Sequence, residues 1–251
     1  VEVVCTTDDP TDNLVHHMQV NHKNEDLKML PTFRPDKAYA FDNYKDYKSY
    51  LEKLETVSNI SIQSLSDLLS VLSSRIDYFH SLGGRLADHG LANIPLNSHQ
   101  HNPEKVFDNL LAGKRISTEE EETLRYHILI ELGKIYHAKG WTQQYHLGAI
   151  RNNSERMMHE LGPDTGFDSI GDFPQATSLA AFLNALDASA QLAKTIVYNL
   201  NPADNEVMAT MIGNFNDGST AGKMQWGSAW WFLDQKDGME KQINTLSNMS
   251  M

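Results

Sequence analysis

The protein has 251 residues, of which 40% are hydrophobic and 22% charged, and its formal net charge is -12. This composition is typical of a soluble globular protein with a sizeable core. It argues against a nucleic-acid partner, because phosphate contacts need clustered Lys and Arg, and the sequence has no apolar run of membrane-spanning length. The single cysteine, Cys5, excludes an internal disulfide and fits a reducing cytoplasm; within its apolar run it is expected to be buried and inert.

Short apolar segments alternate with longer helical patterns along the whole chain. Strands are predicted at residues 1–6, 28–33, 85–88, 142–147, 194–200 and 223–227. Helices are predicted at residues 10–21, 42–57, 61–82, 103–111, 117–139, 154–161, 178–191, 205–213 and 238–247. Apolar strands that alternate with helices indicate an α/β fold with a parallel sheet covered by helices.

A barrel is favoured over an open doubly wound sheet, because no strand-to-helix turn carries a glycine-rich nucleotide-binding sequence. We therefore predict a single domain over residues 1–251 with helical insertions near 42–82 and 93–139. These two long connections are interpreted as scaffold around the barrel, although a lid is the alternative. Because Val1 begins directly on a strand, without Met or a signal peptide, we expect the sequence to be an internal fragment.

Residues 141–153, WTQQYHLGAIRNN, are the most informative segment. Thr142, Gln144 and His146 alternate onto one face of the predicted strand, Gly148 permits a turn, and Arg151 follows in the loop. An imidazole and a guanidinium at the carboxyl end of a strand suit an anionic, oxygen-rich substrate. Arg pairs with carboxylates bidentately, and neutral His coordinates a metal or moves a proton.

Ordered motifs resemble one protein family over almost the whole chain. They are CTTDDP (5–10), LPTFRPD (30–36), RLADHGL (85–91), HLGAIRNN (146–153), LGPDTGFDSIGD (161–172), NLNPADNEVMATMIGNF (199–215) and GKMQWGSAWWFLDQKDGM (222–239). All are similar to the uronate isomerases, also called glucuronate isomerases, which are (β/α)8 TIM barrels of the amidohydrolase superfamily.

The resemblance implies a bacterial, cytoplasmic enzyme that interconverts aldehyde and keto hexuronates. The substrates would be D-glucuronate, converted to D-fructuronate, and D-galacturonate, converted to D-tagaturonate, by proton transfer between C2 and C1 through an enediolate. Such chemistry needs a group that polarises the carbonyl, a group that moves the proton and a cation that holds the C6 carboxylate. The resemblance also implies a divalent metal, zinc, in the complete protein, and a homo-oligomer.

The sequence departs from the family pattern at both ends of the barrel. Members resembling this chain place a His-x-His pair on the first strand and a TDSR segment on the last, and neither is present. The chain would then supply the second to the seventh strand, and the isolated fragment is expected to be inactive. His99 and His101 do form a His-x-His, but they lie in a loop and are interpreted as solvated rather than metal-binding.

Site roles can be assigned residue by residue, each with a structural alternative. Arg34, at the end of its strand, is predicted to bind the substrate carboxylate, and its alternative is a salt bridge to a loop carboxylate. Asp88 and His89, which close the strand at 85–88, are predicted catalytic residues; the alternative is a helix cap or a buried ion pair. His146 is the predicted metal ligand or substrate contact, with its other metal ligands outside this chain, or else a hydrogen-bonded core histidine.

Arg151 is predicted to contact the anion or its enediolate, or else to fix the loop through Asp164 or Asp168. Trp230 and Trp231 are predicted to form a wall against one face of the sugar, or else to belong to the core. Two other functions stay open. One is a metal-dependent hydrolase of the amidohydrolase superfamily, and the other is a noncatalytic fragment that is stable only with a partner.

Overall fold

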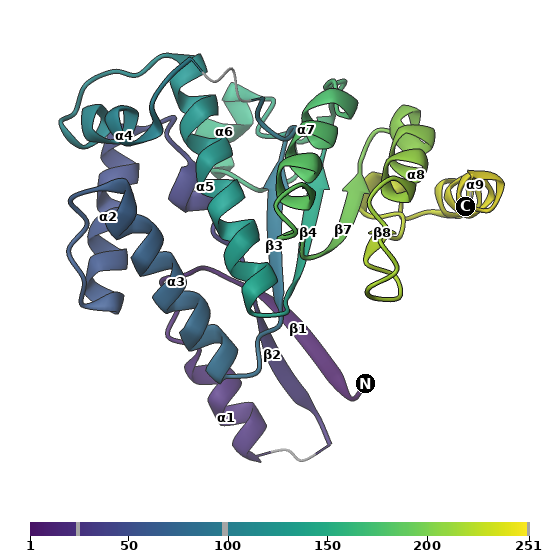
Figure 1. Ribbon diagram of the computed structural model, residues 1–251, viewed down its shortest axis with the longest axis horizontal. Helices are drawn as coiled ribbons and strands as arrows, with labels where there is room; N and C mark the ends of the chain where they lie inside the picture. The colour runs from purple at the N-terminus through teal and green to yellow at the C-terminus, as the bar shows by residue number, and fades with distance from the viewer. Residues whose placement is uncertain (24–25, 97–99, 250–251) are drawn as a thin grey trace. The chain divides into compact units, whose positions relative to one another are not determined.

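The computed structural model describes residues 1–23, 26–96 and 100–249 (Figure 1). Its main strands are β1 (Val3–Asp8), β2 (Lys28–Phe33), β3 (Leu86–Leu91), β4 (Thr142–Leu147), β7 (Lys194–Asn199) and β8 (Met224–Trp226). Its helices are α1 (Val15–Lys23), α2 (Tyr44–Ser58), α3 (Leu65–Ser81), α4 (Pro103–Leu111), α5 (Thr118–Ala138), α6 (Glu155–Leu161), α7 (Ala176–Asp187), α8 (Asn205–Gly213) and α9 (Lys236–Met249). The described part contains no helix long and apolar enough to cross a membrane.

The main sheet is six-stranded, in the order β1-β2-β3-β4-β7-β8. The pairs β1–β2, β2–β3 and β7–β8 are parallel. β3 and β4 also run in the same direction, because the hydrogen bonds from Thr142 N to Arg85 O and from Gly148 N to Leu91 O join equivalent ends of the two strands. In the described residues β1 and β8 are the outermost strands, so the predicted α/β fold with an incomplete parallel barrel is confirmed.

The chain divides into two compact units. The first contains Val1–His89, Pro95–Gln143 and Ser189–Ala193, and the second contains Gly90–Ile94, Gln144–Ala188 and Lys194–Met251. β3 and β4 pass from the first unit into the second. The prediction of one domain over residues 1–251 stays a prediction, and the two units are described separately.

An aromatic cluster forms the core of the first unit behind the end of β2. Phe33, the last residue of β2, packs edge-on against Phe79 of α3, with ring centroids 5.1 Å apart, and against Tyr136 of α5 at 6.5 Å. Trp141 stacks on Tyr136 at 6.0 Å, and all of these side chains are fully buried. Because Phe33 is locked in this cluster, the position of the next residue, Arg34, is set by packing.

In the second unit, helix α7 packs against β4. The β4 side chains Gln143, Tyr145 and Leu147 are buried and alternate with half-buried ones, as predicted. Tyr145 packs edge-on against Phe182 of α7, with ring centroids 5.4 Å apart. The alternation leaves Gln144 and His146 on the opposite face of the strand.

Several predicted boundaries were wrong. β3 does not end at Asp88 but continues to Leu91, whose carbonyl oxygen accepts from Gly148 N at 3.1 Å, so Asp88 and His89 lie inside the strand. Helix α7 ends at Asp187 rather than at residue 191, because Ala190 adopts a φ of 54° that ends any helix. A short antiparallel pair, β5 (Ala149–Ile150) with β6 (Ser169–Ile170), and the 3-10 turns η1 (Asp36–Tyr39), η2 (Pro202–Asp204) and η3 (Trp231–Leu233) were not predicted.

Helix α1 begins at Val15, later than the predicted start at residue 10. Arg75 of α3 explains the difference, because its guanidinium donates to the carbonyl oxygens of Pro10, at 2.7 Å, and Asp12, at 2.8 Å. Those oxygens would otherwise accept hydrogen bonds within the first turns of a helix. Asp9 further holds the loop by accepting from Thr11 N at 2.9 Å.

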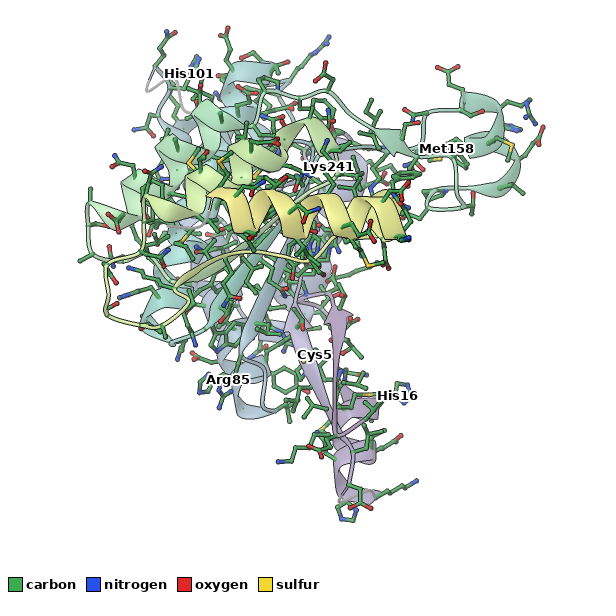
Figure 2. All side chains as sticks on the ribbon, turned by 90° about the vertical axis from the view of Figure 1, so that its right-hand side faces the viewer. Cys5, His16, Arg85, His101, Met158 and Lys241 are labelled. Carbon is green, nitrogen blue, oxygen red and sulfur yellow. The ribbon has the colours of Figure 1, made fainter. Side chains whose placement is uncertain are left out.

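Cys5 is exposed, which corrects the expectation that it is buried. It lies on β1 (Figure 2), where the side chains alternate between exposed and half-buried positions. Val3, Cys5 and Thr7 share the exposed face of β1, so packing does not cover this face of the strand.

We expect the free energy of unfolding to decrease when the pH is lowered, because of His80 in α3. Its Nδ1 accepts from Trp141 Nε1 at 2.9 Å, and since an indole N–H only donates, this nitrogen is unprotonated. Burial, then Arg85 and Lys139, lower the pKa of His80 against the opposing effect of Asp77. A histidine with a lowered folded pKa contributes stability that is complete above the ordinary value of about 6.5 and is lost as pH falls through the folded pKa.

Urea unfolding between about pH 7.5 and pH 5 measures this effect, in a window set by the ordinary histidine pKa. His80→Asn keeps a side-chain acceptor that does not titrate, so its unfolding free energy should fall less steeply over this range than that of the parent. His159→Asn, an exposed histidine on α6, is the matched control and should keep the parental slope. Equal slopes in the parent and His80→Asn would contradict the prediction.

Candidate active site

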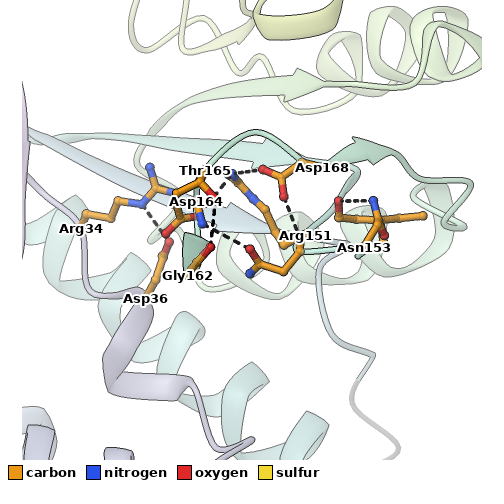
Figure 3. Close-up of polar contacts among 10 residues, drawn as sticks. Arg34, Asp36, Arg151, Asn153, Gly162, Asp164, Thr165 and Asp168 are labelled. Atoms are coloured by element: carbon orange, nitrogen blue, oxygen red, sulfur yellow. Dashed lines mark hydrogen bonds and ion pairs between the residues drawn. The ribbon is translucent and has the colours of Figure 1, made fainter. Parts of the chain in front are cut away.

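Arg34 lies directly after the carboxyl end of β2 and makes two ion pairs within the first unit. Its Nε donates to Asp36 Oδ2 at 2.8 Å (Figure 3), and its Nη1 donates to Asp88 Oδ2 at 2.9 Å. The Asp88 side chain is 7% exposed and the Arg34 side chain 30% exposed. Burial lowers the pKa of the Arg34 guanidinium, but Asp36 and Asp88 raise it, and the net direction is upward. Arg34 is therefore a permanent cation that neighbouring carboxylates hold in place.

The ion pair with Asp36 is the salt bridge to a loop carboxylate that was predicted from the sequence as the alternative role of Arg34. A guanidinium has five N–H donors, and the two contacts leave its Nη2 group without a hydrogen bond to the described residues. With two carboxylates around one guanidinium, an incoming anion meets a compensated charge rather than a bare cation. Arg34 as the carboxylate-binding residue thus stays a prediction, and Nη2 is the group with which it would bind.

His89 is fully buried among aromatic rings. Its Nδ1 lies 2.9 Å from the hydroxyl of Tyr39 in η1, and its ring stacks on the Tyr39 ring with centroids 6.1 Å apart. Tyr39 also donates to Asp36 Oδ1 at 2.5 Å. His89 thus supports Asp36, and through it Arg34, from within the core. These contacts are those of a supporting residue, and the catalytic role of His89 stays a prediction.

A second polar cluster in the first unit was not predicted. Thr6 on β1 donates its hydroxyl to Asp8 Oδ2 at 2.6 Å and also lies 2.6 Å from His17 Nε2. The hydroxyl has a single hydrogen, so it accepts from His17 Nε2. The buried Nδ1 of His17 has no hydrogen-bond partner among the residues that the structure describes. The alternation of Thr6 and Asp8 was visible in the sequence, but their contact with His17 depends on the packing of α1.

In the second unit, His146 is held between two aromatic side chains. Its ring stacks on Tyr198 of β7, with centroids 4.2 Å apart and planes 13° apart. The ring of Trp230 meets it edge-on at 4.6 Å. Tyr198 donates its hydroxyl to Gln144 Oε1 at 3.0 Å, so Gln144, Tyr198 and Trp230 all orient this imidazole directly or through one contact. Tyr198 was not singled out in the sequence.

A buried amide network fixes Trp230. Its Nε1 donates to the carbonyl oxygen of Asn199 at 3.1 Å. The Asn199 side chain accepts from Trp226 Nε1 at 2.7 Å and donates to Asn205 Oδ1 at 2.8 Å. Trp230 is half-buried, and its ring is held beside His146 by this hydrogen bond to the last residue of β7. Trp230 thus lies partly in the core beside His146, and its role as a wall against the sugar stays a prediction.

Arg151 lies in the loop after β5 and is tied to that loop, as its structural alternative predicted. Its Nη1 donates to Asp168 Oδ2 at 3.1 Å and lies 3.9 Å from Asp164 Oδ1 (Figure 3). Asp168, whose side chain is 5% exposed, also accepts from Asn152 N at 2.7 Å. The guanidinium lies over the ring of Trp231 at 4.6 Å, so Trp231 packs against a cation and keeps 37% of its surface exposed.

No group of three or more His, Cys, Asp or Glu side chains that could hold a metal ion occurs in the part of the chain that the structure describes. His146 is the predicted ligand, but a single imidazole in an aromatic setting does not make a metal centre. The residues therefore do not fit a metal by themselves. His99 lies outside the described residues, and His101 Nε2 lies 4.0 Å from Glu119 Oε2.

Comparison with known proteins decides the family. The model of the glucuronate isomerase family matches residues 1–251. The chain belongs to the glucuronate isomerase family. A uronate isomerase of Flavobacterium johnsoniae is 52% identical over 252 aligned residues, covering 100% of this chain and 54% of that protein. One from Bacteroides fragilis is 49% identical with the same coverage. The chain thus spans about half the length of the curated family members that it matches.

Solved structures agree with this assignment. The crystal structure of a uronate isomerase from Thermotoga maritima matches with a TM-score of 0.90 and 27% identity, over 99% of this chain and 53% of that one. A glucuronate isomerase from Caulobacter crescentus matches with a TM-score of 0.88 over 100% of this chain and 51% of that one. At 22% identity, the Caulobacter match supports the fold alone. The family resemblance seen in the motifs is confirmed.

Proposed function

We propose that the protein containing this sequence is an aldose-ketose isomerase of hexuronates. The observation that carries the proposal is the family match over residues 1–251, together with about 50% identity to curated uronate isomerases over the full chain. Within the second unit, His146 lies near the carboxyl end of β4, where parallel α/β folds place their chemistry. The proposed substrates are D-glucuronate and D-galacturonate, and the products are the corresponding 2-keto sugars.

The reaction moves a proton between C2 and C1 of the open-chain sugar through an enediolate. In the second unit, His146 is proposed to hold or move that proton, because a neutral imidazole has one ring nitrogen that accepts a proton and one that donates it, and aromatic side chains fix its ring. The Trp230 ring, fixed through Asn199, offers an apolar wall on which a sugar face can pack. Arg151, over Trp231, is proposed to contact the anion or its enediolate.

Within the first unit, Arg34 is proposed to bind the C6 carboxylate through Nη2, while Asp36 and Asp88 hold its other nitrogens. Asp88 is proposed to orient this guanidinium and hydrogen-bond a substrate hydroxyl. His89 is proposed as a supporting residue behind Tyr39. Zinc in the complete protein stays a proposal, and no step of the reaction is assigned to a metal. A cytoplasmic homo-oligomer without nucleic-acid or membrane partners is likewise proposed, in line with the net charge of -12.

The test uses the natural protein that contains this sequence. The purified protein is incubated with D-glucuronate or D-galacturonate in D2O, and the ketose is followed by NMR. Isomerisation gives a ketose that is an isomer of the substrate. In the fraction of turnovers in which the transferred proton exchanges with solvent, C1 of this ketose carries deuterium. A hydrolase of the same superfamily would leave both sugars unchanged. Absence of ketose with a folded protein would refute the proposal, and metal analysis of the same preparation tests for zinc.

A further inference from the structure

Tyr198 of β7 and His146 of β4 lie side by side on the same face of the sheet in the second unit. The side chains of His146 on β4 and Tyr198 on β7 are both half-buried, and their neighbours along each strand are buried and lie on its opposite face. The two rings are nearly parallel and stacked, with planes 13° apart and centroids separated by 4.2 Å. The Tyr198 ring therefore covers one face of the imidazole and limits the angle that it can adopt.

The next strand explains why the Tyr198 ring can lie there. Gly227 follows β8, and a Cβ added to it would overlap three ring atoms of Tyr198. Gly227 has no left-handed backbone conformation, so the reason for a glycine here is space and not φ. The ring thus rests directly on the Gly227 backbone.

The Gly227 backbone is itself held from two sides. Its N–H donates to Val197 O at 2.9 Å, and Gln242 of α9, which is buried, donates its side-chain amide to the Gly227 carbonyl oxygen. The tyrosine hydroxyl is anchored separately on Gln144. A substituent at Gly227 would therefore be accommodated by movement of the Tyr198 ring rather than of the backbone.

We propose that Tyr198, seated on Gly227, is a positioning residue that sets the orientation of His146. This inference rests on the proposed function in assigning His146 to the reacting centre. The stack contributes through the ring and not through the hydroxyl, because the ring touches the imidazole whereas the hydroxyl contacts Gln144. The alignment of a proton-transferring group matters because a misplacement of about 1 Å costs on the order of 100-fold in rate.

The experiment compares Tyr198→Phe, Tyr198→Leu and Gly227→Ala in the natural protein. Tyr198→Phe keeps the stack and should retain kcat/KM within about threefold. Tyr198→Leu and Gly227→Ala should lower kcat about 10- to 100-fold with KM nearly unchanged, because orientation and not binding is lost. Val197→Ala is the matched control. This buried residue is next to Tyr198 in β7 but lies on the opposite face of the strand, so the variant should lower Tm and keep kcat.

A second readout does not depend on activity. The rate at which diethyl pyrocarbonate modifies each histidine is measured by mass spectrometry of peptides. His146 should react faster in Tyr198→Leu and Gly227→Ala, and at the parental rate in Tyr198→Phe and Val197→Ala. The exposed His159 of α6 is the internal control and should keep its rate in all variants.

Unchanged His146 modification in folded Tyr198→Leu and Gly227→Ala would overturn the inference, as would an equal loss of kcat in Val197→Ala. Failure of the proposed function looks different. In that case the parent protein would not isomerise uronates, yet the modification rates would still report whether Tyr198 positions His146.

Discussion

Replacing Arg34 with Met is expected to lower kcat/KM for a hexuronate by roughly 30- to 1,000-fold, equivalent to about 2 to 4 kcal/mol of lost transition-state stabilisation. Met keeps most of the bulk but removes every N–H donor, including Nη2, which is proposed to bind the substrate carboxylate. Steady-state kinetics of the natural protein with D-glucuronate measure the effect. A kcat/KM within threefold of the parent would rule out the carboxylate role.

The same change removes the guanidinium from the buried Asp88, so stability has to be separated from activity. We expect the unfolding free energy to fall by about 1 to 3 kcal/mol, less than for a fully buried pair because the Arg34 side chain is 30% exposed. The double variant Arg34→Met/Asp88→Asn, which removes the carboxylate charge, should recover part of this stability without recovering activity. Arg156→Met, on an exposed arginine of α6, is the control for loss of a surface cation.

Replacing His146 with Gln is expected to lower kcat by about 100- to 10,000-fold, the range that a positioned general acid-base group contributes. Gln retains polarity and approximate size but has no ring nitrogen that can accept and return a proton. Tyr198 and Trp230 therefore keep a polar neighbour while proton transfer is lost. The measurement is the rate of ketose formation, with circular dichroism to confirm the fold. His159→Gln on α6 should keep the parental rate.

Full activity in a folded His146→Gln protein would show that the imidazole serves packing alone, as a hydrogen-bonded core histidine would. A loss confined to KM would place His146 among binding groups instead of the proton-transfer group.

The hydrophobic periodicity of the sequence was sufficient to predict the arrangement of strands and helices. Apolar strands separated by helical patterns predicted the parallel α/β sheet, and helices α4 and α8 have the predicted bounds. Errors occurred where a distant side chain competes with local propensity. Arg75 takes the carbonyl oxygens of the loop before α1, and the ladder with β4 carries β3 past Asp88. Arg75 and β4 are both far in the sequence from the segments that they affect, so local patterns do not reveal these contacts.

The sequence by itself determined the family, through its ordered motifs, and the strand faces, through alternation: His146 shares a face with Gln144 because side chains on a strand repeat every second residue. Only the tertiary structure decided which side chains meet across strands. Arg34 pairs with Asp88, 54 positions away, and Tyr198 with Gln144, also 54 positions away. Such contacts follow from the order and register of the strands, which are fixed by core packing between segments that long connections separate in the sequence. Alternation along one strand does not encode them.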